Sequence, residues 1–378
     1  MQVKYLNIFK FNFLQVVVLS TPLLIINVKH ATELVILFLT IFGVYFSIRE
    51  RKLPFFHDQL KIYSYLVLAF FFSIVMSVIL SNNPIQGIDR IGSNIHFLVA
   101  PFVAYGIYKS NVDLKHIVFA IKLSVIAAAV YAIYMQHILP GVRVEVGADS
   151  PTIFGFIMAF FGFVAIIDVW TQSNKEKLFS IFVFLLATYS VFLSGTRIAW
   201  IMFAVLFFSA VFIWHIRGYL TKKRLLLILI ALVVLAAFSM NNNTFNDRID
   251  IAFQEIKTFS VDTDSRGSVD LRLSMWSGGL EAFKQQPIVG YGYQNTGLEA
   301  SQHISGSYAK AFIKGQKMLH NDYINSLVGF GILGLLMLLV LIFLPLALFC
   351  KRLKADKECA RSAIGVLFII ALSVFAIT

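Results

Sequence analysis

Three side chains able to handle charge or protons stand out because each lies beside an apolar stretch. Arg197 lies in LSGTRIAW, Arg272 opens RLSMWSGGLEAFKQQPIVGYG, and His320 precedes the apolar run of LHNDYINSLVGFGILG. Two permanent cations suit a pyrophosphate, and a neutral imidazole suits the removal of a proton from a hydroxyl group. We therefore predict that Arg197, Arg272 and His320 are catalytic, and that the two arginines also bind substrate.

Each of these residues also has a purely structural explanation. Arg197 can be an arginine that snorkels to lipid headgroups. Arg272 can be a solvated arginine on a surface helix, although a cation at a helix start opposes the helix dipole unless it has an anionic partner. Asn321 can cap the helix that follows, with Asp322 as a first-turn acid and His320 incidental.

The composition identifies the surroundings of these residues as a membrane. The chain is 58% hydrophobic and 14% charged, and its mean hydropathy is +0.80, which is far outside the range of soluble domains. A helix needs about 17 to 25 apolar residues to cross a bilayer. Candidate spans lie at residues 11–28, 31–48, 60–80, 93–108, 116–139, 151–170, 178–193, 198–216, 225–240, 322–349 and 361–378. We predict an all-α integral membrane protein with 11–12 transmembrane helices.

The predicted organisation is one membrane domain with one inserted loop. Residues 1–240 hold spans one to nine, residues 241–320 form the loop, and residues 321–378 hold spans ten and eleven. A connection this long is usually functional or a small domain of its own. Its helical periodicity predicts amphipathic helices at 248–259 and 271–286, and we expect 295–315 to be mobile.

The second of these loop helices, 271–286, has an uneven distribution of residue sizes. Gly278 and Gly279 would let a neighbouring helix approach closely, and Pro287 with two following glycines should end the helix. The large apolar residues fall on one stripe of this amphipathic helix; they are Leu273, Trp276, Leu280 and Phe283.

The positive charges indicate the orientation of the chain. If the N-terminus is cytoplasmic, most of the 32 lysines and arginines fall on cytoplasmic connections, as in other membrane proteins. The net charge of +12 is then topological, and no nucleic-acid partner is expected. The short outside connections carry only four basic residues, namely Lys29, Arg90, Arg143 and Arg197.

No metal site or cofactor is expected. The sequence lacks a Cys/His cluster, and Asp262-Thr263-Asp264 lies in a polar loop without the strand that precedes metal-binding Asp-x-Asp motifs. Gly329, Gly331 and Gly334 spell G-x-G-x-x-G, but they lie within an apolar span. Small residues there predict a helix packing face rather than a dinucleotide site.

Three stretches together resemble the O-antigen ligase family. His320, Asn321, Gly331 and Gly334 fill the fixed places of a His-[Asn/Ser/Gln]-x9-Gly-x-x-Gly signature. LSGTRIAW looks like the Ser-x-[Ser/Thr]-Arg motif of the same superfamily, and RLSMWSGGLEAFKQQPIVGYG is similar to its loop segment. That family usually has twelve spans, so a twelfth is expected beyond the eleven counted here.

The resemblance implies a metal-independent, inverting glycosyltransferase in the bacterial inner membrane, with its active site on the periplasmic side. The donor would be polysaccharide linked to undecaprenyl pyrophosphate, and the acceptor a sugar hydroxyl of lipid A-core, giving complete lipopolysaccharide. Asn321 would help to bind substrate, and membrane lipids would surround the spans. His320 could be the general base or only position the acceptor.

Two other functions compete with this one. An O-antigen polymerase shares the topology and the donor but uses a second undecaprenyl-linked glycan as acceptor. A transporter or flippase would make Lys122, in the fifth span, and Arg197 the intramembrane charges to explain. Lys122 is close to the predicted cytoplasmic end of its span, where snorkelling accounts for it.

Overall fold

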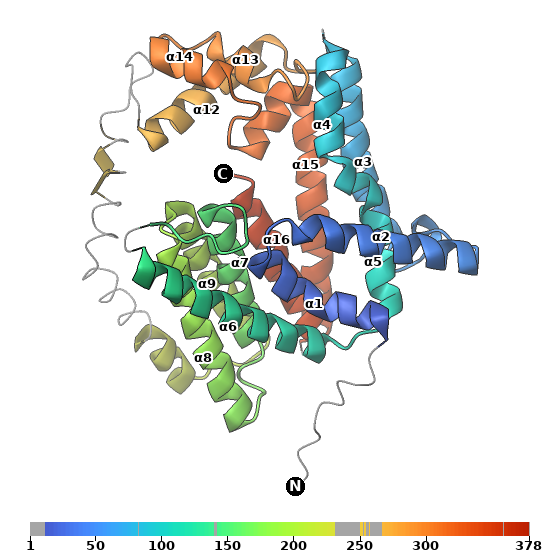
Figure 1. The fold of residues 1–378 in the computed structure, drawn as a ribbon, viewed down its shortest axis with the longest axis vertical. Helices are drawn as coiled ribbons and strands as arrows, with labels where there is room; N and C mark the ends of the chain where they lie inside the picture. Colours follow the sequence, from blue (N-terminus) through green and yellow to red (C-terminus); the bar gives the residue numbers. More distant parts are fainter. Residues whose placement is uncertain are drawn as a thin grey trace. The chain divides into compact units, whose positions relative to one another are not determined.

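The computed structural model describes residues 12–81, 83–139, 142–230, 250–251, 253–254, 257, 267–357 and 359–377 (Figure 1). Every regular element in these residues is a helix, and seven helices are long and apolar enough to cross a membrane. The prediction of an all-α integral membrane protein is therefore confirmed.

The apolar helices coincide with the predicted spans. Seven have the length and composition to cross a membrane: α2 (Ala31–Glu50), α3 (Lys61–Ile79), the segment Pro84–Ser110, α6 (Leu114–Ile138), α8 (Asn174–Leu193), α9 (Arg197–Ile216) and α15 (Asp322–Ala355). Three are shorter: α1 (Phe13–Asn27), α7 (Pro151–Ile166) and α16 (Ala360–Phe375). The predicted span at 225–240 lies largely outside the described residues, although residues 222–230 are helical.

The segment Pro84–Ser110 is not one straight helix. It consists of η3 (Pro84–Gly87), α4 (Ile88–Ser93) and α5 (Ile95–Ser110). A further short helix, η2 (Pro54–Phe56), lies between α2 and α3. Both short helices begin at a proline. Proline suits the first helical position because an N–H group there would have no acceptor within the helix, so its absence costs nothing.

The loop contains more regular structure than the sequence predicts. The expected helix at 248–259 and the Asp262–Asp264 stretch lie essentially outside the described residues. The expected helix at 271–286 is present as α12 (Ser268–Gln285). The segment expected to be mobile instead contains α13 (Thr296–Ser301) and α14 (Ser307–Lys314). These helices are too short for a clear period in the sequence, but they share a core with α12.

The close approach of a neighbour predicted at Gly278 and Gly279 of α12 is present, and these glycines lie on its buried face. Leu280 is exposed, and Leu273, Trp276 and Phe283 are only half-buried. The buried residues of the helix are Asp270, Leu271, Ser274, Met275, Gly278, Gly279 and Ala282. Small residues dominate this face because neighbouring chain segments lie against it. A Cβ on Gly278 would come within 2.4 Å of the Ala300 carbonyl oxygen.

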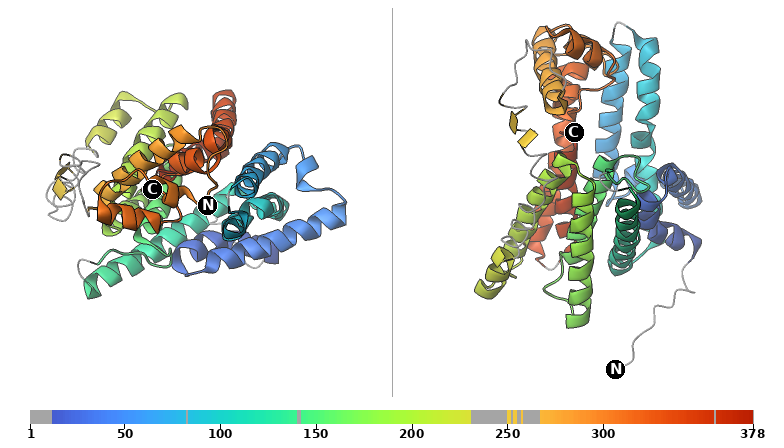
Figure 2. Two further views of the ribbon diagram at one scale, coloured as in Figure 1. Left: turned by 90° about the horizontal axis from the view of Figure 1, so that it is seen from above. Right: turned by 60° about the vertical axis from the view of Figure 1, so that its left-hand side comes forward.

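The chain forms two compact units, which we describe separately. The first comprises Met1–Tyr65 and Val99–Phe203, and the second comprises Leu66–Leu98 and Ala204–Thr378. One core of the first unit is formed by α1 and α2, around Leu14, Val18, Val35 and Leu39. In the second unit, α12, α13 and α14 pack together beside the N-terminal end of α15, as the right-hand view of Figure 2 also shows.

Candidate functional site

The long helix α15 is broken near its N-terminal end. Phe330 has φ −141° and ψ 28°, and Gly331 has φ 61° and ψ −155°, so neither residue is helical. A break of this kind leaves carbonyl and N–H groups without their helical partners, and buried groups must find others. The sequence predicts a single span with a glycine packing face, but the helix is interrupted at Phe330 and Gly331.

The loop after α12 supplies the missing partners. Tyr291 N–H donates to the Val328 carbonyl at 2.9 Å, and Gly292 N–H donates to the Gly329 carbonyl at 2.9 Å. In the other direction, Ile332 N–H donates to the Pro287 carbonyl at 2.8 Å. Residues 287–293 are thus docked on the break of α15 by backbone hydrogen bonds. We call them the docking loop.

Two glycines permit this contact. A Cβ on Gly331 would lie 2.3 Å from the Ile288 carbonyl oxygen, and a Cβ on Gly290 would lie 2.5 Å from the Val328 carbonyl oxygen. Both residues also have positive φ, at 61° and 62°. A side chain would therefore meet backbone atoms and an unfavourable conformation at the same time. The Pro-x-x-Gly-x-Gly and Gly-x-x-Gly stretches of the sequence fold as one unit.

Tyr293 fixes the end of the docking loop in the core. Its N–H donates to Ser77 Oγ at 3.1 Å, and the Ser77 hydroxyl donates to the Gly329 carbonyl at 3.1 Å. Its own hydroxyl donates to Ser326 Oγ at 3.1 Å. Burial raises the pKa of Tyr293 to about 12, so this hydroxyl stays protonated and remains a donor.

The turn that carries His320 is held from two sides through its neighbour Leu319. Leu319 N–H donates to Asn325 Oδ1 at 2.8 Å, and Trp276 Nε1 donates to the Leu319 carbonyl at 3.2 Å. The Leu319 side chain is fully buried. Asn321 then caps α15, because its Oδ1 accepts from Tyr323 N–H at 3.0 Å and Ile324 N–H at 3.2 Å. The cap predicted at Asn321 is present.

His320 itself has a left-handed backbone. Its φ of 50° is unfavourable for a residue with a side chain, at a cost of about 1 to 2 kcal/mol. Hydrogen bonds on Leu319 and Asn321 hold this conformation from both neighbours. The capping of α15 uses Asn321 and does not require a histidine at position 320.

Arg272 lies on the helix that holds this turn. It is half-buried in the first turns of α12, one turn before Trp276, the residue that bonds the Leu319 carbonyl. The packing between the helices is close, since a Cβ on Gly279 would lie 2.8 Å from side-chain carbons of Ile324 and Leu319. The structure thus brings the elements of Arg272, His320 and Asn321 together in the second unit.

Arg197 belongs to the first unit, where it begins α9 after the short turn that follows α8. Gly195 has φ 59°, and Ser194 Oγ lies 3.1 Å from Thr196 Oγ1, so the Ser-Gly-Thr turn is closed by its own hydroxyl groups. A Cβ on Gly155 would lie 2.7 Å from Ser194 Oγ. The predicted turn between the two spans is present, and the arginine at its end is half-buried.

The sequence analysis did not select Arg90, which belongs to the same cluster as His320. Arg90 lies in α4, and its positive charge acts on Asp322 and on Tyr293. The charge of His320 also acts on Asp322. Arg90 could have been found from the sequence, because it is one of four basic residues on the short connections predicted to lie outside. The rule that singled out Arg197 applies to it equally.

Comparison with known proteins finds similarity over part of the chain and to one further protein. Residues 182–339 match the family model described as O-antigen ligase, and this range contains Arg197, Arg272, His320 and the break of α15. An uncharacterized protein of Haemophilus influenzae is 25% identical over 331 residues, which cover 83% of this chain and 78% of that protein.

Proposed function

Because residues 182–339 match the O-antigen ligase family model, we propose that the protein transfers O-antigen polysaccharide from undecaprenyl pyrophosphate to a sugar hydroxyl of lipid A-core. The reaction would take place on the periplasmic face of the bacterial inner membrane. The observation that carries this proposal is the turn at His320, where an imidazole is held in a strained conformation at the end of a membrane helix.

The arginines are assigned to the leaving group. When the anomeric carbon–oxygen bond breaks, the electron pair and the negative charge go to undecaprenyl pyrophosphate. Fixed cations that meet this charge lower the barrier, because they need no reorganisation during the reaction. Arg272 is suited to this role by its rigid helix, and Arg197 by its closed turn.

His320 is assigned to the acceptor. Its neutral imidazole takes the proton from the attacking hydroxyl while the new carbon–oxygen bond forms, and it later gives that proton to water. A single displacement of this kind inverts the anomeric carbon. A positioned base contributes about 10² to 10⁴ in rate. No ATP is required, because the bond to pyrophosphate is already activated.

Asn321 is assigned to holding the turn and to binding substrate. Its Oδ1 is occupied by the two N–H groups at the start of α15. Its Nδ2 has no hydrogen-bond partner among the described residues, so it can donate to a sugar or phosphate oxygen. Asn321→Asp would keep the cap and remove the donor.

The decisive experiment is reconstitution. Purified protein in liposomes is incubated with undecaprenyl pyrophosphate-linked glycan and lipid A-core, without ATP and with a chelator, and both lipids are followed by gel and mass spectrometry. Glycan on lipid A-core is the expected result. Growth of the prenyl-linked glycan instead would identify a polymerase, and no covalent change in either lipid would favour transport.

The same assay tests the assigned residues. We expect His320→Ala to lower the rate about 10² to 10⁴-fold. Arg272→Ala should lower it about 10² to 10³-fold, as for other groups that stabilise a developing negative charge. His137→Ala and Arg143→Ala are matched controls, because both side chains are exposed at the ends of other elements. Activity of both site variants close to that of the controls would refute the assignment.

A further inference from the structure

A second polar arrangement lies in the first unit, where α2 and α5 cross. The two backbones touch at this point, because a Cβ on Gly43 would lie 1.9 Å from the Phe102 carbonyl oxygen. A Cβ on Gly106 would lie 2.6 Å from the Leu39 carbonyl oxygen. Glycines at a crossing of membrane helices allow this close approach. The crossing therefore fixes α2 against α5.

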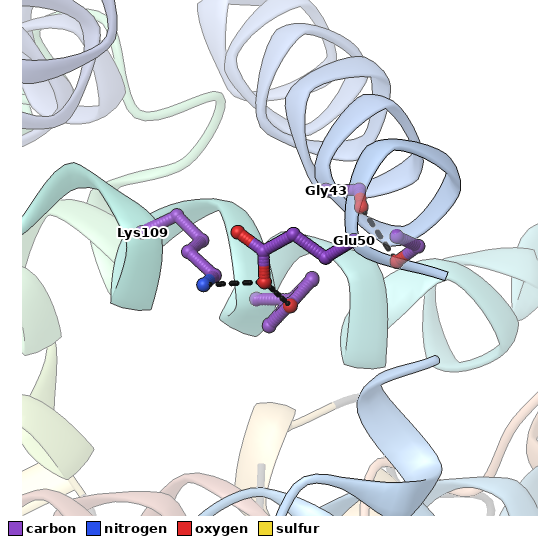
Figure 3. Close-up of polar contacts among 5 residues, drawn as sticks. Gly43, Glu50 and Lys109 are labelled. Carbon is purple, nitrogen blue, oxygen red and sulfur yellow. Dashed lines mark hydrogen bonds and ion pairs between the residues drawn. The ribbon is translucent and has the colours of Figure 1, made fainter. Parts of the chain in front are cut away.

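At the end of α2, beyond the crossing, the carboxylate of Glu50 binds two side chains of α5. Lys109 Nζ lies 2.6 Å from Glu50 Oε2, and the Tyr105 hydroxyl donates to the same oxygen at 2.8 Å (Figure 3). The ammonium group of Lys109 also lies over the ring of Tyr105, 5.3 Å from its centroid. Glu50 is thus neutralised on the α5 side.

A groove of 350 Å³ lies on α2 next to this ion pair. Its walls are almost entirely apolar, and two basic residues contribute to them; the lining residues are Val44, Ser47, Ile48, Arg51, Lys52, Leu53 and Phe102. The Ser47 hydroxyl donates to the Gly43 carbonyl at 2.7 Å, so it does not make the groove polar. The volume is at the lower end of the range for ligand pockets, about 300 to 1,000 Å³.

The two cations have no carboxylate partner of their own within the described ranges. Glu50, the neighbour of Arg51, is engaged by Lys109. Asp58 interacts electrostatically with Lys52, but it forms its ion pair with Lys61, whose Nζ lies 3.2 Å from the carboxylate. Arg51 and Lys52 are both exposed. The groove therefore has a net positive charge.

The backbone around Arg51 places these charges at the groove. Arg51 ends α2 with φ 49°, and Lys52 N–H donates to the Ser47 carbonyl at 3.1 Å. Glycine is the usual residue in this left-handed position after a helix. A glycine would be favoured in this backbone conformation, yet the chain has an arginine with its charged side chain here.

The level of the groove in the membrane is indicated by aromatic residues. Tyrosines are enriched where a membrane meets water. Tyr45 and Tyr108 are half-exposed near the ends of α2 and α5, and Phe56 and Tyr63 are exposed around the connection that carries Arg51. Arg51 and Lys52 therefore lie at headgroup level, with the apolar groove directed along the helix into the acyl region.

From the apolar groove and its two basic residues, we propose that the groove between α2 and α5 binds an anionic phospholipid. One acyl chain lies against Val44, Ile48 and Phe102, and the phosphate is held by Arg51 and Lys52. The occupant is a bilayer lipid with a net negative headgroup, such as phosphatidylglycerol. This site does not depend on the transfer chemistry proposed above.

The test is lipid selectivity. The purified full-length protein is equilibrated in mixed micelles with equal amounts of phosphatidylglycerol and phosphatidylcholine of the same acyl chains, and bound lipids are counted by native mass spectrometry. Each basic residue at a membrane surface contributes about a fivefold preference for anionic lipid. Arg51→Gln together with Lys52→Gln should therefore lower the preference for phosphatidylglycerol about 25-fold.

Two controls separate this site from general surface charge. Arg49→Gln together with Lys61→Gln removes two charges from the neighbouring ends of α2 and α3 without changing a groove-lining residue, and because Lys61 is already paired with Asp58, it should lower the preference clearly less than the groove variant. Ile48→Trp fills the groove with both cations intact and should lower phosphatidylglycerol binding. Equal binding of both lipids to wild type, or equal loss in the two double variants, would overturn the proposal.

Discussion

The turn at His320 and the groove at Arg51 both place charged side chains beside membrane helices, but the fold holds them differently. Around His320, the side chains of Trp276 and Asn325 hydrogen-bond the backbone of Leu319, and Asn321 caps α15. Around Arg51, the nearest fixed contact is a side-chain ion pair, and the cations themselves are exposed. Transfer chemistry needs groups held in place, whereas a lipid headgroup needs only charge of the right sign.

The largest effect on folding should come from Gly331→Ala. The new Cβ would lie 2.3 Å from the Ile288 carbonyl oxygen, in a backbone conformation that only glycine adopts readily. We expect the free energy of unfolding to fall by about 3 to 5 kcal/mol, measured by chemical unfolding in detergent. Gly92→Ala is the control, because a Cβ there has nothing within 4 Å. Similar losses in both variants would contradict a docking loop that depends on Gly331.

Trp276→Phe should have a smaller effect on stability and a clear effect on activity. It removes the donor to the buried Leu319 carbonyl, which should cost about 1 to 3 kcal/mol. Because that hydrogen bond holds the neighbour of His320, the transfer rate should fall about tenfold or more. Leu280→Ala on the exposed side of the same helix should change neither quantity appreciably. If the Phe variant kept full activity, the turn would not need this support.

The smallest effect is expected from Glu50→Gln in the other region. Glu50 and Lys109 are partly exposed, and pairs of this kind contribute about 0.2 to 1 kcal/mol. The free energy of unfolding should therefore change by less than about 1 kcal/mol, because the close contact of α2 and α5 at Gly43 and Gly106 remains. Asp113→Asn, which removes a more exposed pair with Lys115, should give no measurable change. A loss of several kcal/mol from Glu50→Gln would mean that the ion pair, and not the crossing, joins α2 to α5.

The spans could be predicted from the sequence because each is a long apolar run, and the bilayer permits few structures other than helices. The start of α15 was predictable too, since Asn321 is a favourable cap and Asp322 suits the first turn. The residues that resemble the O-antigen ligase signature could also be recognised in the sequence. The motif alone did not show that Gly331 lies at a break in the helix.

The break in α15 could not be predicted from hydropathy. Phe330 and Gly331 lie within an apolar run, and glycine is common in continuous membrane helices. What breaks the helix is the docking loop, which lies about 40 residues earlier in the chain and supplies the partners for the freed backbone groups. The hydropathy of the span itself gives no information about contacts with a loop so far away in the sequence.

The close contact of α12 with its neighbours was predicted at Gly278 and Gly279, but the apolar stripe alone does not show which large residues the helix buries. A stripe of large apolar residues indicates burial only when the partner surface is far enough away to accommodate them. At Gly278 and Gly279 the partner is so close that small residues fill the contact, and Leu280 remains exposed. Arg90 was not selected although it lies, like Arg197, on a short outside connection, and its charge acts on Asp322.

The break also divides α15 mechanically. The part from Ile332 to Ala355 is about 36 Å long at 1.5 Å per residue, enough to cross a hydrocarbon core of about 30 Å by itself. The part from Asp322 to Gly329 is therefore a separate short helix, and the docking loop is hydrogen-bonded to residues on both sides of the break. The bilayer thickness has to be matched only by the longer part, while protein contacts with the docking loop and α12 position the short helix that carries Asn321, with His320 just before it.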